Sequence, residues 1–154
     1  MSLAVYAPLS GDLSALGKVP DPVFAAQMVG AGLAVEPPCE TGPVDVVAPV
    51  AGAVVKLHPH AFVIRTSGGT GVLVHMGIDT VRLNGEGFRA HIAEEQHVEV
   101  GQTVITFDPM AVRAHGLSAI CPVVVLDSPP GSAQPPAVTG PIRAGALLFS
   151  WAAS

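Results

Sequence analysis

The sequence predicts an all-β fold, an antiparallel β-sandwich of the barrel-sandwich kind with one or two short helices. The chain of 154 residues carries 15 prolines and 17 glycines, so turns are frequent and long helices are disfavoured. Between these turn residues lie short runs of apolar, largely β-branched residues, and no helical segment separates most of them. We therefore expect strands joined by short turns, in a single domain over residues 1–154.

The expected elements follow from where the β-branched runs begin and end. Two short helices are predicted: one over 23–28, with Asp21 as N-cap and Pro22 at its first position, and one over 109–115, ended by Gly116. The expected strands are 4–7, 30–36, 44–48, 52–57, 61–66, 71–75, 98–100, 104–107, 122–126 and 146–151.

Composition limits the partners that the protein can have. Hydrophobic residues make up 49% and charged residues 12% of a chain whose formal net charge is −5. Lys18 and Lys56 are the only lysines, which argues against nucleic acid or an anionic membrane as a partner. A partner with a basic face fits this charge better.

The sequence carries no targeting or membrane signal. It has no apolar run near the roughly 18 residues that span a bilayer, and its first residues lack a basic region. We expect a cytoplasmic protein without membrane insertion. Cys39 and Cys121 are too far apart in sequence for a CxxC motif, so we expect buried or incidental thiols.

Two predicted hairpins order the middle of the chain. The turn at 67–70 would pair strands 61–66 and 71–75, which brings His60, at the start of one strand, next to His75, at the end of the other. Gly101 and Gln102 predict a second hairpin, between strands 98–100 and 104–107. Three further histidines have acidic or polar neighbours and are expected at the surface: His91, His97 and His115.

A pair of imidazoles has two chemical uses. A neutral imidazole nitrogen accepts a phosphoryl group, a second histidine can orient it, and backbone N–H groups around Gly77 can hold the phosphoryl oxygens. The alternative is zinc, with His58, His60, His75 and Asp79 as candidate ligands. The local residues leave both uses open.

A longer motif surrounds His75. It comprises His75-Met76-Gly77-Ile78-Asp79-Thr80-Val81 and Leu83-Asn84-Gly85-Glu86-Gly87-Phe88, and His60-Ala61-Phe62 and Val100-Gly101-Gln102-Thr103-Val104-Ile105 accompany it. In this order the segments resemble the glucose-family IIA component of the bacterial phosphoenolpyruvate-dependent sugar phosphotransferase system. The resemblance covers nearly the whole chain.

The resemblance implies a β-sandwich and a covalent mechanism. His75 matches the histidine that takes a phosphoryl group on Nε2 from the phosphohistidine of the carrier HPr and passes it to the cysteine of a sugar-specific IIB domain. His60 matches the second histidine, needed for onward transfer. Gly77 and His58 would support the site, but His58 replaces a hydroxyl residue of relatives. A hydrogen bond that orients His60 is then either replaced or lost.

The resemblance also implies a partner surface. Asp21 and Asp79 match acids that face arginines of a partner. Lys56 and Leu57 occupy positions that are often aromatic or acidic in relatives, which would change partner preference. The positions that match an apolar docking rim, and that the bare sequence would assign to the core, are Val23, Phe24, Met28, Val29, Leu73 and Met76.

No cofactor is required by the resemblance, although His60 and His75 can hold zinc together with a carboxylate of a bound partner. Two other functions stay open at this point. One is a zinc-dependent hydrolase built on the histidine cluster. The other is a regulatory binding module, which could coexist with phosphoryl transfer if target proteins read the phosphorylation state. Glucose and N-acetylglucosamine are both reasonable sugars.

Overall fold

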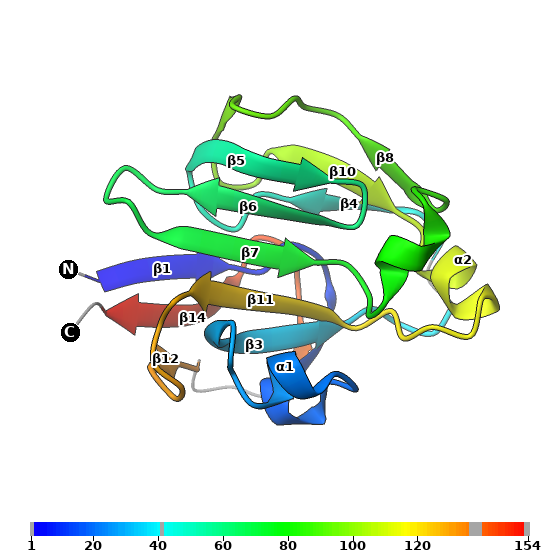
Figure 1. Cartoon of the computed structure of the whole chain (residues 1–154), viewed down its shortest axis with the longest axis horizontal. Helices are drawn as coiled ribbons and strands as arrows, with labels where there is room; N and C mark the ends of the chain where they lie inside the picture. The colour runs from blue at the N-terminus through cyan, green and yellow to red at the C-terminus, as the bar shows by residue number, and fades with distance from the viewer. Residues whose placement is uncertain (1, 41, 136–139, 153–154) are drawn as a thin grey trace.

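The computed structural model describes residues 2–40, 42–135 and 140–152, which form three antiparallel sheets (Figure 1). The all-β prediction is confirmed. The helical segments are the 3-10 helices η1 (Leu16–Lys18) and η2 (Thr80–Leu83) and the α-helices α1 (Pro22–Ala25) and α2 (Pro109–Ala114). The strands are β1 (Ser2–Tyr6), β2 (Gly11–Ala15), β3 (Gly30–Glu36), β4 (Val44–Val47), β5 (Gly52–His58), β6 (Ala61–Arg65), β7 (Gly71–His75), β8 (Phe88–Ala90), β9 (His97–Val98), β10 (Thr103–Phe107), β11 (Cys121–Leu126), β12 (Ala133–Gln134), β13 (Pro141–Ile142) and β14 (Leu147–Ala152).

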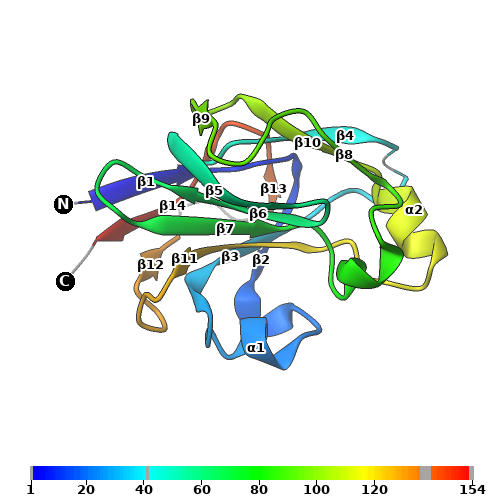
Figure 2. The ribbon, with the colours of Figure 1, turned by 45° about the horizontal axis from the view of Figure 1, so that its top comes forward.

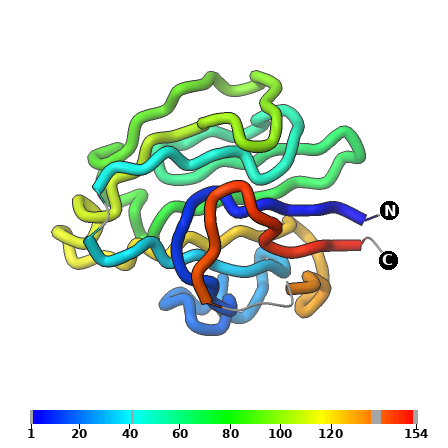
Figure 3. The backbone as a smooth tube through the Cα atoms, turned by 180° about the vertical axis from the view of Figure 1, so that it is seen from behind, coloured from blue at the N-terminus to red at the C-terminus, as the bar shows by residue number. Residues whose placement is uncertain are grey.

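The largest sheet has eight strands in the order β13-β2-β3-β11-β7-β6-β5-β9. Two sheets of three strands, β1-β14-β12 and β4-β10-β8, lie behind it and face the viewer in Figure 3. Because β1 pairs with β14, with Ser2 opposite Ala152, the first and last strands of the described chain lie side by side. The layers form the sandwich that the short strands predicted.

Side chains alternate along β7 between the core and the outer face of the large sheet. Val72 and Val74 are fully buried in the main core, whereas Leu73 and His75 lie on the opposite face. The helix α1 lies beside β2 and β3 in Figure 2, and a second apolar cluster that includes its Phe24 covers part of that outer face. Its buried members are Leu16, Val19, Phe24, Ala34, Ile78, Ile120 and Val124.

The hairpin predicted at 67–70 is confirmed, and the one predicted at Gly101 is wrong. In the first, Ala61 lies opposite His75 and Arg65 opposite Gly71. In the second region β10 pairs with β4 and β8, while β9 pairs with β5 in the large sheet. The backbone N–H of Gly101 donates to the carbonyl of Ala48 (3.0 Å), so the turn leads from one sheet to the next instead of folding a strand back on itself.

Both predicted helices form, and both are shorter than expected. Asp21 and Pro22 start α1 as predicted, but the helix stops at Ala25, and Gln27 already has a positive φ of 57°. The strands that sequence reasoning missed are short or rich in polar and small residues: β2, β8, β12 and β13. No helix in the described ranges has the length and apolar character needed to cross a membrane.

Candidate functional site

His75 lies at the end of β7 on the outer face of the large sheet, between two aromatic rings. The ring centroid of His60 is 5.2 Å away at an interplanar angle of 69°, and that of Phe24 from α1 is 5.3 Å away at 61°. Strand pairing produces the first contact, because β6 begins beside the end of β7 and the N–H of Met76 donates to the carbonyl of His60 (2.8 Å). The predicted meeting of the two imidazoles is therefore present.

The loop after His75 fixes the tautomer of its ring. Nδ1 of His75 lies 2.5 Å from the carbonyl oxygen of Gly77. A carbonyl can only accept, so Nδ1 carries the proton and Nε2 of the neutral ring keeps its lone pair. The sequence predicts that N–H groups around Gly77 hold phosphoryl oxygens. In the structure Gly77 is buried, and its carbonyl serves His75.

Two residues that sequence reasoning did not single out hold this loop. The buried Thr80 donates its hydroxyl proton to the carbonyl of Met76 (2.8 Å), and the carbonyl of Ser118 accepts from the N–H of Ile78 (2.9 Å). Gly77 has a φ of +77°, and a Cβ there would lie 2.6 Å from Thr80 Cγ2. Glycine is thus required both by the backbone conformation and by the space.

Burial keeps both imidazoles neutral near pH 7. It lowers the pKa of His75, although the Gly77 carbonyl and the charges of Asp21 and Asp79 act in the opposite direction. It also lowers the pKa of His60 to about 4, with further contributions from the charges of His75 and then His58. A neutral His75 has the free nitrogen that a nucleophile needs.

His58 stacks on the ring of His60. The ring centroids are 5.7 Å apart and the planes differ by 24°. Among the hydrogen bonds of the described residues none involves the His60 ring, so His58 contacts this ring by stacking and not by a hydrogen bond. His58 itself is exposed.

The predicted docking rim divides into exposed, half-buried and buried residues. Val23 and Met28 are 44% and 74% exposed, and Val29 and Leu73 are partly buried. Phe24 is mostly buried beneath the rim, with its ring against His75.

The prediction that Met76 belongs to the docking rim is wrong. Its side chain has no exposed surface, because it continues the inward series of Val72 and Val74. The two acids predicted to face a partner, Asp21 and Asp79, come before and after His75 in the sequence. Asp21 caps α1, with its carboxylate accepting from the N–H groups of Val23 and Phe24, and Asp79 is exposed.

A zinc site built from this chain alone does not fit the geometry. Zinc in proteins takes three or four protein ligands. The portion of the chain that the structure describes contains no group of three or more His, Cys, Asp or Glu side chains that could hold a metal ion. The hydrolase interpretation is therefore not favoured.

Comparison with known proteins gives one consistent family. The family model for the phosphoenolpyruvate-dependent sugar phosphotransferase system, EIIA 1, matches residues 3–129. The PTS system glucose-specific EIIA component of Halalkalibacterium halodurans is 46% identical over 123 residues, which cover 79% of this chain and 69% of that protein. The PTS system glucosamine-specific EIICBA component of Bacillus subtilis is 45% identical over 119 residues, or 76% of this chain but only 18% of that longer protein.

A solved structure agrees in fold over almost the full length of both chains. Glucose permease IIA from Mycoplasma capricolum superimposes with a TM-score of 0.85 at 32% sequence identity, and the match covers 97% of this chain and 96% of the other.

Proposed function

This chain belongs to the EIIA 1 family of the phosphoenolpyruvate-dependent sugar phosphotransferase system, and we propose that it carries the phosphoryl group on His75. It is thus a phosphotransferase-system component acting in phosphorylation-coupled sugar uptake. The donor is HPr and the acceptor is the IIB domain of a sugar permease. The proposal locates the exchange in the cytoplasm and involves no cofactor. For a zinc ion shared with a partner carboxylate, this chain would supply only two ligands, the imidazoles of His60 and His75.

The observation that carries the proposal is the hydrogen bond from Nδ1 of His75 to the carbonyl of Gly77. It leaves the lone pair of the neutral ring on Nε2, and His75 lies on the outer face of the sheet, where a partner can present its phosphoryl group. Nε2 forms a bond to phosphorus while the bond from phosphorus to the donor imidazole breaks. The donor nitrogen leaves with its electron pair.

Phosphorylation makes the His75 ring cationic, because Nδ1 keeps its proton. The Gly77 carbonyl and the charges of Asp21 and Asp79 then stabilise the positive ring. His60, neutral and at 5.2 Å between ring centroids, can donate its N–H to the phosphoryl oxygens during onward transfer. In that second step the bond from Nε2 to phosphorus breaks as the cysteine sulfur of the IIB domain forms its own bond to phosphorus.

Labelling from phosphoenolpyruvate, with the two general phosphotransferase proteins present, tests these roles. We expect His75→Ala to lose all label. His60→Ala should be labelled yet transfer to a IIB domain about a hundredfold or more slowly. His97→Ala, at an exposed histidine paired with Glu99, is the matched control and should behave like the natural sequence. Undiminished labelling of His75→Ala would disprove the proposal.

A further inference from the structure

We propose that a cationic surface beside the histidines selects IIB acceptors that present an apolar side chain next to carboxylates. This surface, called here the cationic flank, consists of Lys56 and Arg65 on the outer face of β5 and β6, where Arg65 also lines a cavity. The inference rests on the proposed function, since it assigns a specificity role to the same face of the sheet. It concerns the choice of acceptor and not the chemistry at His75.

Strand register places the flank on the face that carries His75. Ala61 lies opposite His75, and Arg65, four residues further along β6, lies on the same face and opposite Gly71. Lys56 lies opposite Val63, which is itself two residues from Ala61. Four residues of strand correspond to about 13 Å, so a protein docked over the histidines would reach the flank.

A cavity of about 390 Å³ gives the flank its apolar part. Val55, Val63, Leu126 and Trp151 contribute apolar wall, and Arg65 and Asp127 are its charged lining residues. A cavity of this composition suits one large apolar side chain with polar groups at its edge.

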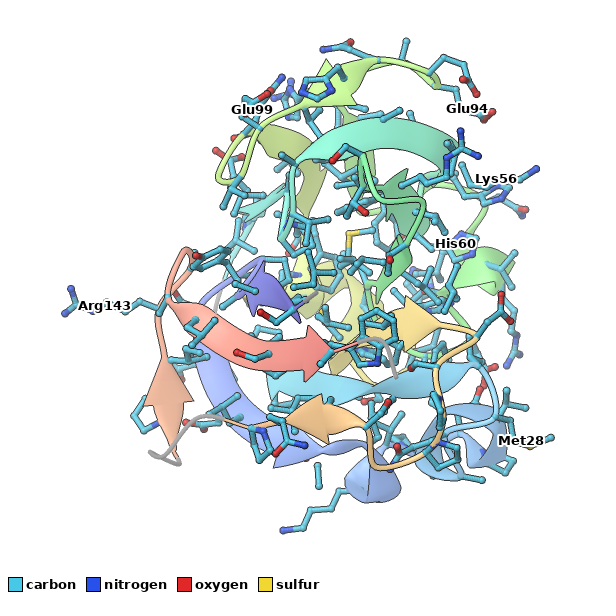
Figure 4. The ribbon with its side chains drawn as sticks, turned by 90° about the vertical axis from the view of Figure 1, so that its left-hand side faces the viewer. Met28, Lys56, His60, Glu94, Glu99 and Arg143 are labelled. Carbon is cyan, nitrogen blue, oxygen red and sulfur yellow. The ribbon has the colours of Figure 1, made fainter. Side chains whose placement is uncertain are left out.

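The two cations of the flank have no ionic partner in the structure. Within the described ranges, carboxylates lie within 4.0 Å of Arg113, His97 and His115 only. Lys56 is one of two lysines in a chain with a net charge of −5, and Figure 4 shows it projecting on the side of the molecule where His60 also lies. Cations placed against the overall charge favour an acidic partner edge.

No helix or strand covers this part of the sheet in Figure 1, whereas α1 and the second apolar cluster cover the outer face of β3 and β11. The outer face therefore has two regions beside His75. The region of α1 contributes the carboxylate of Asp21 and the exposed side chains of Val23 and Met28, and the region of β5 and β6 contributes the flank.

The partner that the cationic flank would select is the acceptor, the IIB domain. HPr serves as a general donor, whereas each IIB domain is specific to a sugar permease. A specificity feature that lies outside the phosphoryl site therefore suits the IIB domain, which differs from one permease to another.

Charge-reversal variants distinguish the role of the cationic flank in acceptor choice from the phosphoryl transfer at His75. Lys56→Glu and Arg65→Glu are compared with Arg143→Glu, an exposed arginine on the opposite side of the molecule in Figure 4. The rate of phosphoryl transfer from each labelled variant to the purified IIB domains of the same organism is measured at about 0.05 M and about 0.5 M salt. Val63→Phe, which fills the cavity with an apolar ring, tests the apolar part.

We expect each flank reversal to slow transfer to the cognate IIB domain about three- to tenfold at low salt, with the difference shrinking at high salt. Val63→Phe should slow the same transfer at both salt concentrations, and labelling by HPr should be unchanged in all variants. Rates equal to those of Arg143→Glu would overturn the inference, as would an equal loss in labelling by HPr. If the natural sequence took up no label at all from HPr, that result would instead refute the proposed function.

Discussion

At the scale of single residues, the site depends on the imidazole of His75. Burial keeps this ring neutral, and the carboxylates of Asp21 and Asp79 would stabilise a positive charge on it. Burial is the largest influence on the pKa of His75, and the Gly77 carbonyl, Asp21 and Asp79 oppose it. In the proposed mechanism the His75 ring must be neutral to attack, and it becomes cationic once it carries the phosphoryl group. The same acids therefore contribute more to the phosphorylated state than to the free state.

The low pKa of His60 predicts how stability changes with pH. The pKa of His60 is about 4 in the folded protein and 6.5 for an ordinary histidine, so below pH 6.5 the unfolded chain binds the proton more readily. The free energy of unfolding should fall as pH decreases from about 6.5 toward 4. Between pH 7 and pH 5 we expect His60→Gln to lose less stability than the natural sequence, by less than about 1 kcal/mol because His60 is partly exposed.

Urea denaturation at the two pH values measures this difference. His97→Gln, at an exposed position, is the control and should keep the pH dependence of the natural sequence. A His60→Gln variant with that same pH dependence would contradict the assignment of a depressed pKa to His60.

At the scale of single elements, the short helix α1 links the fold to the site. Its N-cap carboxylate, Asp21, satisfies two backbone N–H groups, and the same charge acts on His75. Its Phe24 ring packs both into the second apolar cluster and against His75. Helix capping, apolar packing and the electrostatic effect on His75 therefore all come from α1 and its N-cap residue.

Substitutions at Asp21 separate these two roles. Asp21→Ala removes the cap and should cost about 1 kcal/mol of stability, as should Asp108→Ala at the equivalent position of α2. Asp21→Asn keeps a capping oxygen but removes the charge. We expect it to retain stability and to accept phosphoryl groups more slowly from HPr. Denaturation midpoints and initial labelling rates measure the two effects, and equal labelling rates for Asp21→Asn and the natural sequence would exclude the electrostatic role.

At the scale of the whole molecule, the core of the sandwich stabilises the fold and also buries a reactive group, the thiol of Cys121. Cys121 is fully buried in the main core, and burial raises the pKa of its thiol to about 12. Cys39 is exposed. A thiol reagent should therefore modify Cys39 in the folded protein and Cys121 only on unfolding.

Thiol labelling thus reports the stability of the core. Phe107 is fully buried and stacks on Phe88 with ring centroids 5.4 Å apart. We expect Phe107→Ala to lower the free energy of unfolding by about 3–5 kcal/mol and to speed modification of Cys121 by about a hundredfold or more. Val81→Ala, at a side chain that is 61% exposed, should change neither quantity appreciably. Unaltered Cys121 labelling in Phe107→Ala would show that local opening, and not global unfolding, exposes the thiol.

The sequence by itself determined the all-β class, the cap of α1, the hairpin at 67–70 and the pair of histidines that this hairpin brings together. These features depend on neighbours in the chain: β-branched runs, turn residues and a hairpin whose register follows from its turn. The motif around His75 likewise identified the family, because its residues are contiguous.

Only the tertiary structure decided what depends on distant partners. The pairing of β10 with β4 and β8, the burial of Met76 and the anchoring of the His75 loop by Ser118 all join segments far apart in sequence. The neutral state of His60 has the same origin, since burial and neighbouring imidazoles, not the residue type, lower its pKa. A local pattern specifies which residues can react, whereas long-range packing sets which face, which tautomer and which charge they present.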